Sequence, residues 1–550
     1  MTERKWWKEA VFYQIYPKSF YDANGDGIGD LKGITQKLPY LKELGITALR
    51  ICPFYQSPMV DNGYDISDYY QVNPEFGSIE DAEELLQCAK RYGIRVILDM
   101  VLNHTSDQHP WFREACADKN SKYRDYYIFR DDISKASQFR SIFGGSTWTR
   151  TEDGSWYYHT FAQQQPDLNW ENPGLRKELY TMINWWLDRG ISGFRLDAIT
   201  CIQKDMSFPR VEADGADGLC DLRNYGLNVP GIEEKLRELK KETYGRGDYV
   251  TVAEAPGIPG ERLEEYIGED VFFSMIFDFS YTDIDLEPGS PWAKMRRWSL
   301  EEFKEKLFRN QRFVSETGWA ANYLENHDQP RSISKYFQRK DIEKYSDQMA
   351  KALGTLFFFL RGTPFIYQGE ELGMRNTCFS SIDEVNDVNS LGQYERALEE
   401  GYTRQEALDA VNRRSRDHAR YPMQWNGDLN FGFSEGKPWI QCGQTCGELT
   451  VERESVDGQS VLSYYKKMIR LRNHSPYSEV LIYGDLEEIA PDPDIICYKR
   501  IRGGEEVRVA VNMSGKTLPF AEMRQVLLSN YEDPSGAALL RPYEAAVWVE

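Results

Sequence analysis

The first two thirds of the chain alternate short apolar runs with amphipathic helical stretches, and no other feature restricts the fold as strongly. Such alternation predicts a parallel sheet covered by helices. Eight apolar runs in this order predict a (β/α)8 TIM barrel, an α/β fold. The predicted strands span residues 11–16, 46–51, 95–100, 193–196, 249–253, 272–279, 320–324 and 364–367.

Three segments do not fit a regular barrel. Residues 104–173, after the third strand, are aromatic and polar and too long for a βα loop, so they predict an inserted subdomain. Residues 370–458, after the eighth strand, form a second insertion. Short alternating strands in residues 479–550 predict a C-terminal antiparallel β-sandwich. The barrel itself then comprises residues 1–103 and 174–478.

Charge and cysteine content exclude several classes of partner. The 550 residues carry a formal net charge of −21, which opposes binding to nucleic acid or anionic lipid. The apolar runs are too short to span a membrane, and the N-terminus lacks the apolar core of a secretory signal. Nine scattered cysteines suit free thiols in a reducing compartment. We expect a cytoplasmic protein, monomeric or weakly homo-oligomeric.

Polar side chains gather where four of the predicted strands end. They are Asp99, Asn103 and His104 after strand three, Arg195 and Asp197 on strand four, Glu254 on strand five, and His327 and Asp328 on strand seven. Barrel active sites assemble at these carboxyl ends. A single strand-end aspartate more often caps the next helix. The coincidence at four ends favours an active site, either a metal centre or an acid–base site.

The neighbours of Asp197 and Glu254 favour acid–base chemistry. Arg195 lies two residues before Asp197 and shares its face of the strand, so we expect it to lower the pKa of that carboxyl and keep it ionised as a nucleophile. Glu254 follows an apolar run, which predicts a raised pKa and a proton donor. Two carboxyls with unlike environments are what a retaining glycosidase requires.

These residues lie in a series of motifs. "DMVLNH", "QPDLNW", "GFRLDAI", "TVAE" and "ENHD" resemble the five ordered motifs of glycoside hydrolase family 13, the α-amylase superfamily. "VFYQIYPKSFYDANGDGIGDLKGI", "DNGYDISDYY", "GTPFIYQGEELGM" and "SRDHARYPMQW" are similar to its oligo-1,6-glucosidase and α-glucosidase branch. The resemblance implies Asp197 as nucleophile, Glu254 as general acid/base and Asp328 as a third carboxylate that stabilises the transition state.

The resemblance also implies six residues around the first glucose unit: Asp61, Tyr64, His104, Arg195, His327 and Arg416. Asp61 and Arg416 would grip the terminal hydroxyls, and Tyr64 would stack on the ring. Such a closed end would restrict the protein to exo-action on short oligosaccharides. The alternative for Asp61 and Arg416 is a surface ion pair.

The residue after the nucleophile bears on the bond that is cleaved. Within this branch Val there goes with α-1,6 preference, whereas smaller residues go with α-1,4, and here it is Ala198. A few methyl groups are worth only about 1–3 kcal/mol. We therefore expect a retaining exo-α-glucosidase that favours maltose and maltooligosaccharides, with isomaltose and sucrose as further substrates. The alternatives are an oligo-1,6-glucosidase, a transglucosylase or sucrose isomerase, and a non-catalytic amylase-like binding protein.

The stretch "DANGDGIGD" begins like an EF-hand calcium loop but has Gly33 where the bidentate glutamate would stand. A calcium sensor is therefore the weakest hypothesis. Family members bind a structural calcium through residues that match Asp22, Asn24, Asp26, Asp30 and the carbonyl of Ile28. Calcium or magnesium at this loop, and no cofactor for catalysis, are the expectations. The alternative is a glycine-rich turn with solvated acids.

Overall fold

The computed structural model describes residues 4–215, 217–268, 271–287, 289–443, 449–489, 492–533 and 538–550. Eight parallel strands form its central sheet, in the order β13-β12-β10-β5-β2-β1-β15-β14. They are β1 (Phe12–Ile15), β2 (Ala48–Ile51), β5 (Arg95–Val101), β10 (Gly193–Asp197), β12 (Val250–Glu254), β13 (Met275–Phe277), β14 (Ala321–Asn322) and β15 (Thr363–Tyr367). A parallel bridge between Ile276 and Ala320 joins the two edges, so the sheet closes. The predicted barrel is confirmed, although β13 and β14 are shorter than predicted.

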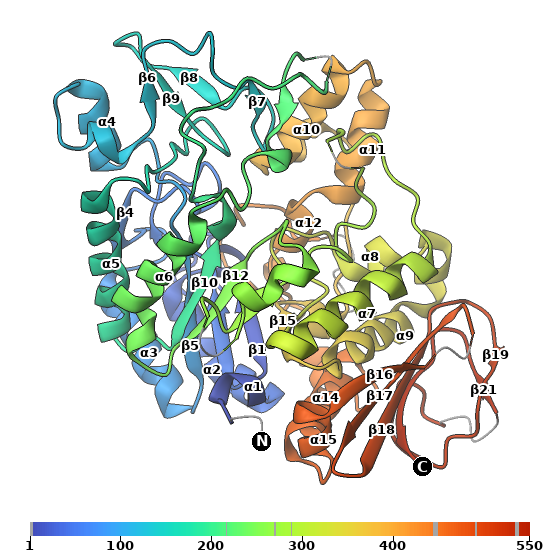
Figure 1. Cartoon of the computed structure of the whole chain (residues 1–550). Coiled ribbons are helices and arrows are strands. Elements are labelled where there is room, and N and C mark those ends of the chain that lie inside the picture. Colours follow the sequence, from blue (N-terminus) through green and yellow to red (C-terminus); the bar gives the residue numbers. More distant parts are fainter. Residues whose placement is uncertain are drawn as a thin grey trace.

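Helices surround this barrel (Figure 1). They are α2 (Leu31–Leu44), α3 (Ile79–Arg91), α5 (Pro173–Asp188), α6 (Ile232–Glu242), α7 (Leu300–Thr317), α9 (Arg339–Phe358) and α14 (Val461–His474). Local sequence sets their ends: Asp30 accepts from Gly33 N at the start of α2, and Gly45 ends that helix with φ +100°. At α3, Ser78 and Asp81 form a capping box.

The barrel interior changes from apolar to charged along the strands. Near their N-terminal ends it is filled by apolar side chains, for example Phe12, which stacks on Phe365 with 4.5 Å between ring centroids. Two residues further along the strands, where side chains return to the same face, Arg50 and Asp99 are fully buried. The charged layer therefore lies at the carboxyl end, with a packed apolar floor beneath it.

A small subdomain follows β5 and covers the carboxyl end of the barrel (Figure 1, top). It holds α4 (Pro110–Ala117), β6 (Phe129–Arg130), β7 (Phe139–Arg140), β8 (Trp148–Arg150) and β9 (Trp156–Tyr158). The segment after β10 also packs here: β11 (Cys220–Asp221) pairs with β7, and Phe208 and Leu222 share its core. The chain beyond the nucleophile strand therefore returns to this subdomain.

Two further parts complete the molecule. The insertion after β15 carries α10 (Val388–Glu399), α11 (Arg404–Arg414), α12 (Asp417–Arg420) and α13 (Val451–Val456). After α15 (Ser478–Tyr483), an antiparallel sheet has the order β16-β17-β18-β22-β20, with β16 (Asp485–Ile489), β17 (Ile495–Arg502), β18 (Glu505–Asn512), β20 (Gln525–Ser529) and β22 (Ala545–Val549). One face joins the main core, whereas the other packs towards the short strands β19 (Leu518–Pro519) and β21 (Leu539–Leu540). The C-terminal antiparallel sheet is confirmed, and its second layer is this two-stranded pair.

Candidate active site

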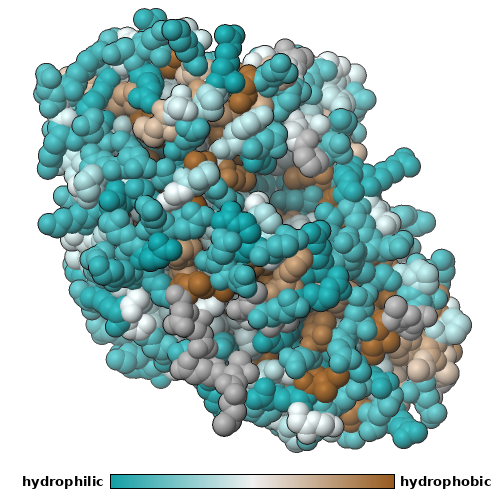
Figure 2. Space-filling view, viewed as in Figure 1, coloured by the Kyte–Doolittle hydropathy of each residue, from teal (hydrophilic) through white to brown (hydrophobic). Residues whose placement is uncertain are grey.

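A cavity of about 330 Å³ lies at the carboxyl ends of the barrel strands. The face drawn in Figure 1 is hollowed near its centre, as the space-filling view in Figure 2 shows. Predicted site residues that line the cavity are Asp61, Tyr64, His104, Asp197, Ala198, Glu254, Asp328 and Arg416. A larger hollow of about 920 Å³ lies at the opposite end of the barrel, around Lys90, Arg95 and Asp188. We place the site in the smaller cavity because the buried acids converge there.

One arginine bridges the two acids that the sequence singles out. Arg195 Nη1 donates to Asp197 Oδ1 at 2.5 Å, and its Nη2 donates to Glu254 Oε2 at 2.5 Å. The backbone N–H of Ala198 also donates to Glu254 Oε2, at 3.1 Å. The two carboxyls, which end β10 and β12, therefore face the same cavity from neighbouring strands.

Burial raises the pKa values of both carboxyls, whereas the sequence predicts a raised pKa for Glu254 alone. Burial raises the pKa of Asp197 above its ordinary value in spite of Arg195, so the expected lowering is wrong. Desolvation of the carboxylate outweighs attraction to a cation that is shared with Glu254. Burial, together with the charges of Asp197 and Asp328, raises the pKa of Glu254 to about 7. Glu254 is thus the carboxyl poised to hold a proton near neutral pH.

Asp328 has the opposite environment. His327 Nε2 lies 2.9 Å from its Oδ2, and Arg416 Nη1 donates to its Oδ1 at 3.0 Å. Burial would raise the pKa of Asp328, but His327, Arg416 and Arg420 outweigh it and hold that pKa well below the usual range. Asp328 is therefore the carboxylate that stays ionised most firmly.

The end of the cavity beyond Asp328 is closed by paired side chains. Arg416 Nη2 donates to Asp61 Oδ1 at 2.8 Å, and the two residues are only 6% and 4% exposed, so the alternative of a surface ion pair is wrong. Tyr64 stacks on His327, with 5.1 Å between ring centroids, and donates to Asp99 Oδ2 at 2.6 Å. Charged side chains and one aromatic ring thus close this end of the cavity.

His104 completes this end. Its Nε2 lies 3.2 Å from the Tyr64 carbonyl and 3.2 Å from Gln165 Nε2. Gln165 also donates to Asp61 Oδ2 at 3.2 Å. Burial lowers the pKa of His104 to about 4, so its ring is neutral at physiological pH and offers hydrogen bonds without charge.

The opposite side of the cavity is less polar. Ala198, Leu227 and Trp292 line it, with Asn389 from the first turn of α10. Ala198 has φ +43°, a left-handed conformation that disfavours large side chains after the nucleophile. The buried Asn389 Oδ1 has no hydrogen-bond partner among the described residues. Small and apolar side chains therefore make up much of this side.

Comparison with known proteins agrees with this geometry. Residues 14–484 match the family model for the alpha amylase catalytic domain. The chain belongs to glycoside hydrolase family 13, the α-amylase superfamily.

Relatives within the family differ in their reactions. The chain is 42% identical to an oligo-1,6-glucosidase of Parageobacillus thermoglucosidasius, with 99% of both chains covered. It is 39% identical to a trehalose-6-phosphate hydrolase of Escherichia coli, again with 99% of both covered. A solved isomaltulose synthase from Klebsiella sp. LX3 has a TM-score of 0.94, 39% identity and 99% coverage of both chains. As a member of this family, the protein is a glycoside hydrolase.

Sequence reasoning missed the residues that support Arg416 in this glycoside hydrolase. Asp387, at the start of α10, accepts from Arg416 Nε at 2.7 Å and is fully buried. Arg420 contacts the same carboxylate, with 3.6 Å between Nη1 and Oδ1. The "SRDHAR" motif contains both arginines, but no local signal ties them to Asp387.

A second missed pair lies under the cavity. Arg50 donates from Nε to Asp99 Oδ1 at 2.9 Å and from Nη2 to Oδ2 at 3.0 Å. Arg195 also lies 3.5 Å from Asp99 Oδ2. Asp99, which the sequence placed in the site, therefore lies behind Arg195 and Tyr64 as a support and not among the cavity-lining residues.

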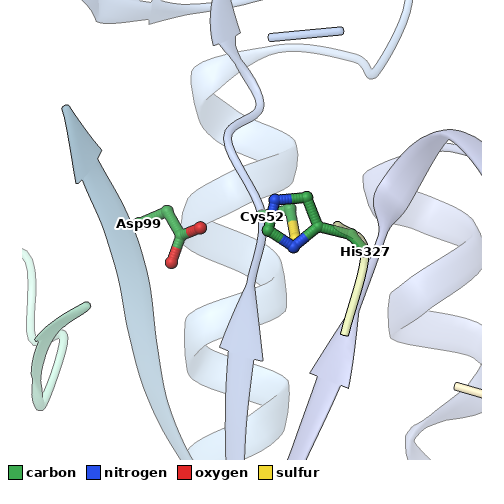
Figure 3. Close-up of side chains that lie close together, drawn as sticks. All are labelled: Cys52, Asp99 and His327. Carbon is green, nitrogen blue, oxygen red and sulfur yellow. The ribbon is translucent and has the colours of Figure 1, made fainter. Parts of the chain in front are cut away.

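The side chains of Cys52, which follows β2, Asp99 on β5 and His327 in the segment after β14 point toward one another (Figure 3). Within the described ranges they are the only group of three His, Cys, Asp or Glu side chains whose possible metal-ligand atoms all lie within 4.8 Å of one another. Arg50 occupies both Asp99 oxygens, and Gln14 Nε2 contacts Cys52 Sγ at 3.3 Å and His327 Nδ1 at 2.9 Å. Because every candidate ligand is already engaged and two arginines are adjacent, we interpret the group as side chains that hold His327 in place and not as a metal centre.

The loop 22–30 lies between β1 and α2. Asp22 accepts from Gly25 and Gly27 N–H groups at 2.7 Å each, and Ser434 from the insertion donates to it at 2.6 Å. Asn24 and Asp26 each accept from the backbone two residues on. The donor set of carboxylates, one amide and the Ile28 carbonyl consists of hard oxygens, which fits Ca²⁺.

Among the helices of the described residues, none combines the length and the hydropathy that a bilayer span requires.

Proposed function

We propose that this protein is a retaining, exo-acting α-glucosidase that releases glucose from the non-reducing end of short α-glucosides. One observation carries the proposal: Arg195 bridges two buried carboxyls, Asp197 and Glu254, inside a cavity that is closed at one end. A protonated acid and an ionised nucleophile beside the same bond are the requirements of double displacement.

The residues support a two-step reaction. Asp197 attacks the anomeric carbon, while Glu254 gives its proton to the glycosidic oxygen, so the bond to the leaving sugar breaks and a glucosyl ester forms. Glu254, now ionised, takes a proton from water, whose oxygen attacks the anomeric carbon and releases Asp197. Asp328 and its arginines would hold sugar hydroxyls and stabilise the positive charge that develops on the ring.

The closed end supports exo-action. Asp61, Arg416 and His104 offer charged and neutral hydrogen-bond partners to a terminal glucose, and Arg416 and Gln165 join them through direct contacts at this end. Only the terminal unit of a chain can then reach Asp197. The closed end does not determine how many sugar units can lie on the leaving-group side of the cleaved bond.

The small Ala198 side chain supports α-1,4 preference, with maltose as the favoured disaccharide. The second candidate is α-1,6 cleavage, because one of the relatives named above is an oligo-1,6-glucosidase. A third is sucrose isomerisation, which the similarity to isomaltulose synthases favours.

Charge pairing in the cavity argues against a phosphorylated sugar. Each arginine that lines the cavity already contacts a carboxylate: Arg223 lies 3.4 Å from Asp221, Arg414 2.6 Å from Asp285, and Arg416 2.8 Å from Asp61. A phosphate group would therefore meet arginines whose charge is already partly compensated. We therefore propose neutral sugars as substrates, in contrast to the trehalose-6-phosphate hydrolase relative.

A substrate panel tests the proposal. The protein is incubated with maltose, isomaltose, sucrose, trehalose and trehalose 6-phosphate, and products are separated by chromatography. We expect free glucose, fastest from maltose, and little product from trehalose 6-phosphate. Dominant isomaltulose or trehalulose from sucrose would replace the hydrolase by the isomerase, and fastest release from isomaltose would replace α-1,4 by α-1,6.

We also propose that loop 22–30 holds a structural calcium ion, with magnesium as the alternative. An ion bound only by the folded state at a hundredfold excess over its Kd adds about 2.7 kcal/mol to the free energy of unfolding. Chelation should lower Tm by several degrees, and Asp26→Asn should reduce that shift. A Tm that chelation leaves unchanged would favour a metal-free turn.

The cytoplasmic location and the monomeric or weakly associated state stay predictions. The cysteines of the described ranges are all free, which suits a reducing compartment, and Cys446 lies outside those ranges. Size-exclusion chromatography with light scattering measures the assembly state.

A further inference from the structure

A buried glutamine on the first barrel strand belongs to the charged layer beneath the cavity. Gln14, on β1, is only 2% exposed and lies in register with Arg50 on β2. Its Oε1 accepts from Arg50 Nη1 at 3.0 Å, and its Nε2 lies 2.9 Å from His327 Nδ1 and 3.3 Å from Cys52 Sγ. The amide therefore connects the buried arginine to the histidine that precedes Asp328.

Arg50 determines which way the Gln14 amide faces. A guanidinium has donors and no acceptor, so the amide oxygen must face Arg50 and the NH₂ group must face His327. The reverse orientation would set amide N–H groups against guanidinium N–H groups. Because an amide N–H points at His327 Nδ1, that nitrogen must be the acceptor and carry no proton. A neutral ring in this arrangement has its proton on Nε2.

Other side chains around the imidazole do not take the place of the amide. Besides Asp328, charged or titratable groups approach the ring from several elements: Tyr16 after β1, Cys52 after β2, Tyr64 between β2 and α3, Asp99 on β5 and Arg420 on α12. The two tyrosine rings stack on it, both Asp99 oxygens accept from Arg50, and Arg420 donates to the backbone carbonyl of His327 at 3.2 Å. The hydrogen-bond partner of Nδ1 among these groups is the Gln14 amide.

Asp328 and Gln14 act on the ring in opposite directions. Burial lowers the pKa of His327, but the charge of Asp328 outweighs burial and raises that pKa to about 9. This attraction alone would favour the protonated ring about a hundredfold at neutral pH. A proton on Nδ1 would meet the amide N–H and leave two buried donors without acceptors, which costs about 10³-fold. The amide therefore outweighs Asp328 and keeps the ring neutral.

A neutral ring preserves the negative charge of Asp328. Arg416 Nη1 and Arg420 Nη2 lie 3.0 and 3.4 Å from its Oδ1, whereas its Oδ2 lies 2.9 Å from His327 Nε2. An imidazolium there would cancel the charge of the second oxygen as well. Positive charge develops on the sugar ring in the transition state of glycoside hydrolysis, and an uncancelled carboxylate oxygen stabilises it.

We propose that Gln14 is a positioning residue that holds His327 as the neutral tautomer with its proton on Nε2, so that Asp328 keeps its charge for the transition state. Gln14 is not among the residues that line the cavity and acts through His327. The effect on catalysis rests on the proposed glucosidase function and deepens it, whereas the protonation state of the ring does not depend on that function.

NMR of the protein with ¹⁵N-labelled histidine rings tests the tautomer without substrate. Long-range proton–nitrogen spectra at neutral pH distinguish a neutral ring, with one unprotonated nitrogen, from an imidazolium, and His327→Gln identifies the signals. We expect the wild-type ring to be protonated on Nε2 alone. Gln14→Met removes the amide donor, so the charge of Asp328 should then protonate Nδ1. Gln311→Met is the matched control, because Gln311 is a buried amide, 3% exposed, that bonds to Asn322.

Kinetics tests the consequence for catalysis. Gln14→Met should lower kcat by about tenfold and change KM little, because Asp61 and Arg416 still hold the ground-state sugar whereas the transition state loses part of its stabilisation. Gln14→Glu is the second variant and preserves the shape of the side chain. Its carboxylate can accept from Arg50 and from a protonated Nδ1, so it should give an imidazolium and the same loss of kcat.

Two spectra would overturn the assignment: a wild-type ring that is protonated on Nδ1, or a ring in Gln14→Glu that keeps Nδ1 unprotonated. The expected ring states with an unchanged kcat in both Gln14 variants would contradict the link to Asp328. The expected ring states in a wild-type protein that hydrolyses none of the sugars would contradict the proposed function and leave the role of Gln14 in the tautomer standing.

Discussion

The two sides of the catalytic cavity are built differently. At the closed end, Asp61, Asp328 and Arg416 are buried and joined by ion pairs. At the leaving-group side, the Arg223 side chain is 51% exposed, and the boundary is formed by Ala198 and other small or apolar groups. Charge pairs therefore fix one sugar unit, whereas small and apolar groups together with the exposed Arg223 meet the next.

This difference has an energetic consequence. Breaking one partner of a buried charge pair costs about 3–5 kcal/mol, because the other charge is left uncompensated. A change of a few methyl groups in a pocket is worth about 1–3 kcal/mol. Substitutions at the closed end should reduce activity on every substrate, and those at the leaving-group side should shift the ratio between substrates.

The largest effect is expected at the junction of the two sides. Asp197→Asn should lower kcat by at least about 10⁴-fold on all substrates, since an amide cannot form the glucosyl ester. Because burial raises the pKa of Asp197 and so penalises its charge, Tm should stay equal or rise. Substantial residual kcat with an unchanged circular dichroism spectrum would remove Asp197 as the nucleophile.

At the closed end, Asp387→Asn should lower kcat/KM by about ten- to a hundredfold, through a raised KM, because Arg416 loses its buried partner. The ratio of isomaltose to maltose rates should not move. Asp383→Asn, an exposed aspartate of the same insertion, is the control. A changed linkage ratio would contradict the division of roles between the two sides.

The pH dependence tests the proton donor between the two sides. Burial raises the pKa of Glu254 to about 7, so the protonated, active form is lost as pH rises through that value. We expect kcat/KM to fall up to about tenfold per pH unit above 7. Glu254→Gln should abolish this alkaline limb as well as most activity. A limb that persists in that variant would assign the titration to another group.

The smallest effect is expected at the leaving-group side. Ala198→Val should move the isomaltose-to-maltose rate ratio towards isomaltose by about two- to tenfold. Its left-handed backbone should also make valine destabilising, by about 1 kcal/mol, so Tm is measured with the rates. Ala198→Gly, which tolerates this φ, is the control. An unchanged ratio in the valine variant would undercut the α-1,4 preference.

Much of the barrel and of the acid set could be predicted from the sequence, because both depend on local patterns. Apolar runs mark the strands, and carboxyls at their ends mark the cavity. Asp387 could not be found this way, because an aspartate before a helix is normally interpreted as an N-cap. Asp387 does cap α10, and it also binds Arg416. The pKa of Asp197 was predicted in the wrong direction because the sequence shows its neighbouring arginine but not its depth of burial.

Hydrolysis of maltotriose labelled with ¹³C in its reducing-end unit distinguishes retaining exo-cleavage from every other mode of cleavage. Proton and carbon NMR follow the first minutes of hydrolysis. A retaining enzyme with a cavity closed beyond Asp61 and Arg416 should release unlabelled glucose, initially as the α-anomer, and leave labelled maltose. Labelled glucose as the first product would contradict exo-action from the non-reducing end, and an initial β-anomer would contradict the retaining mechanism.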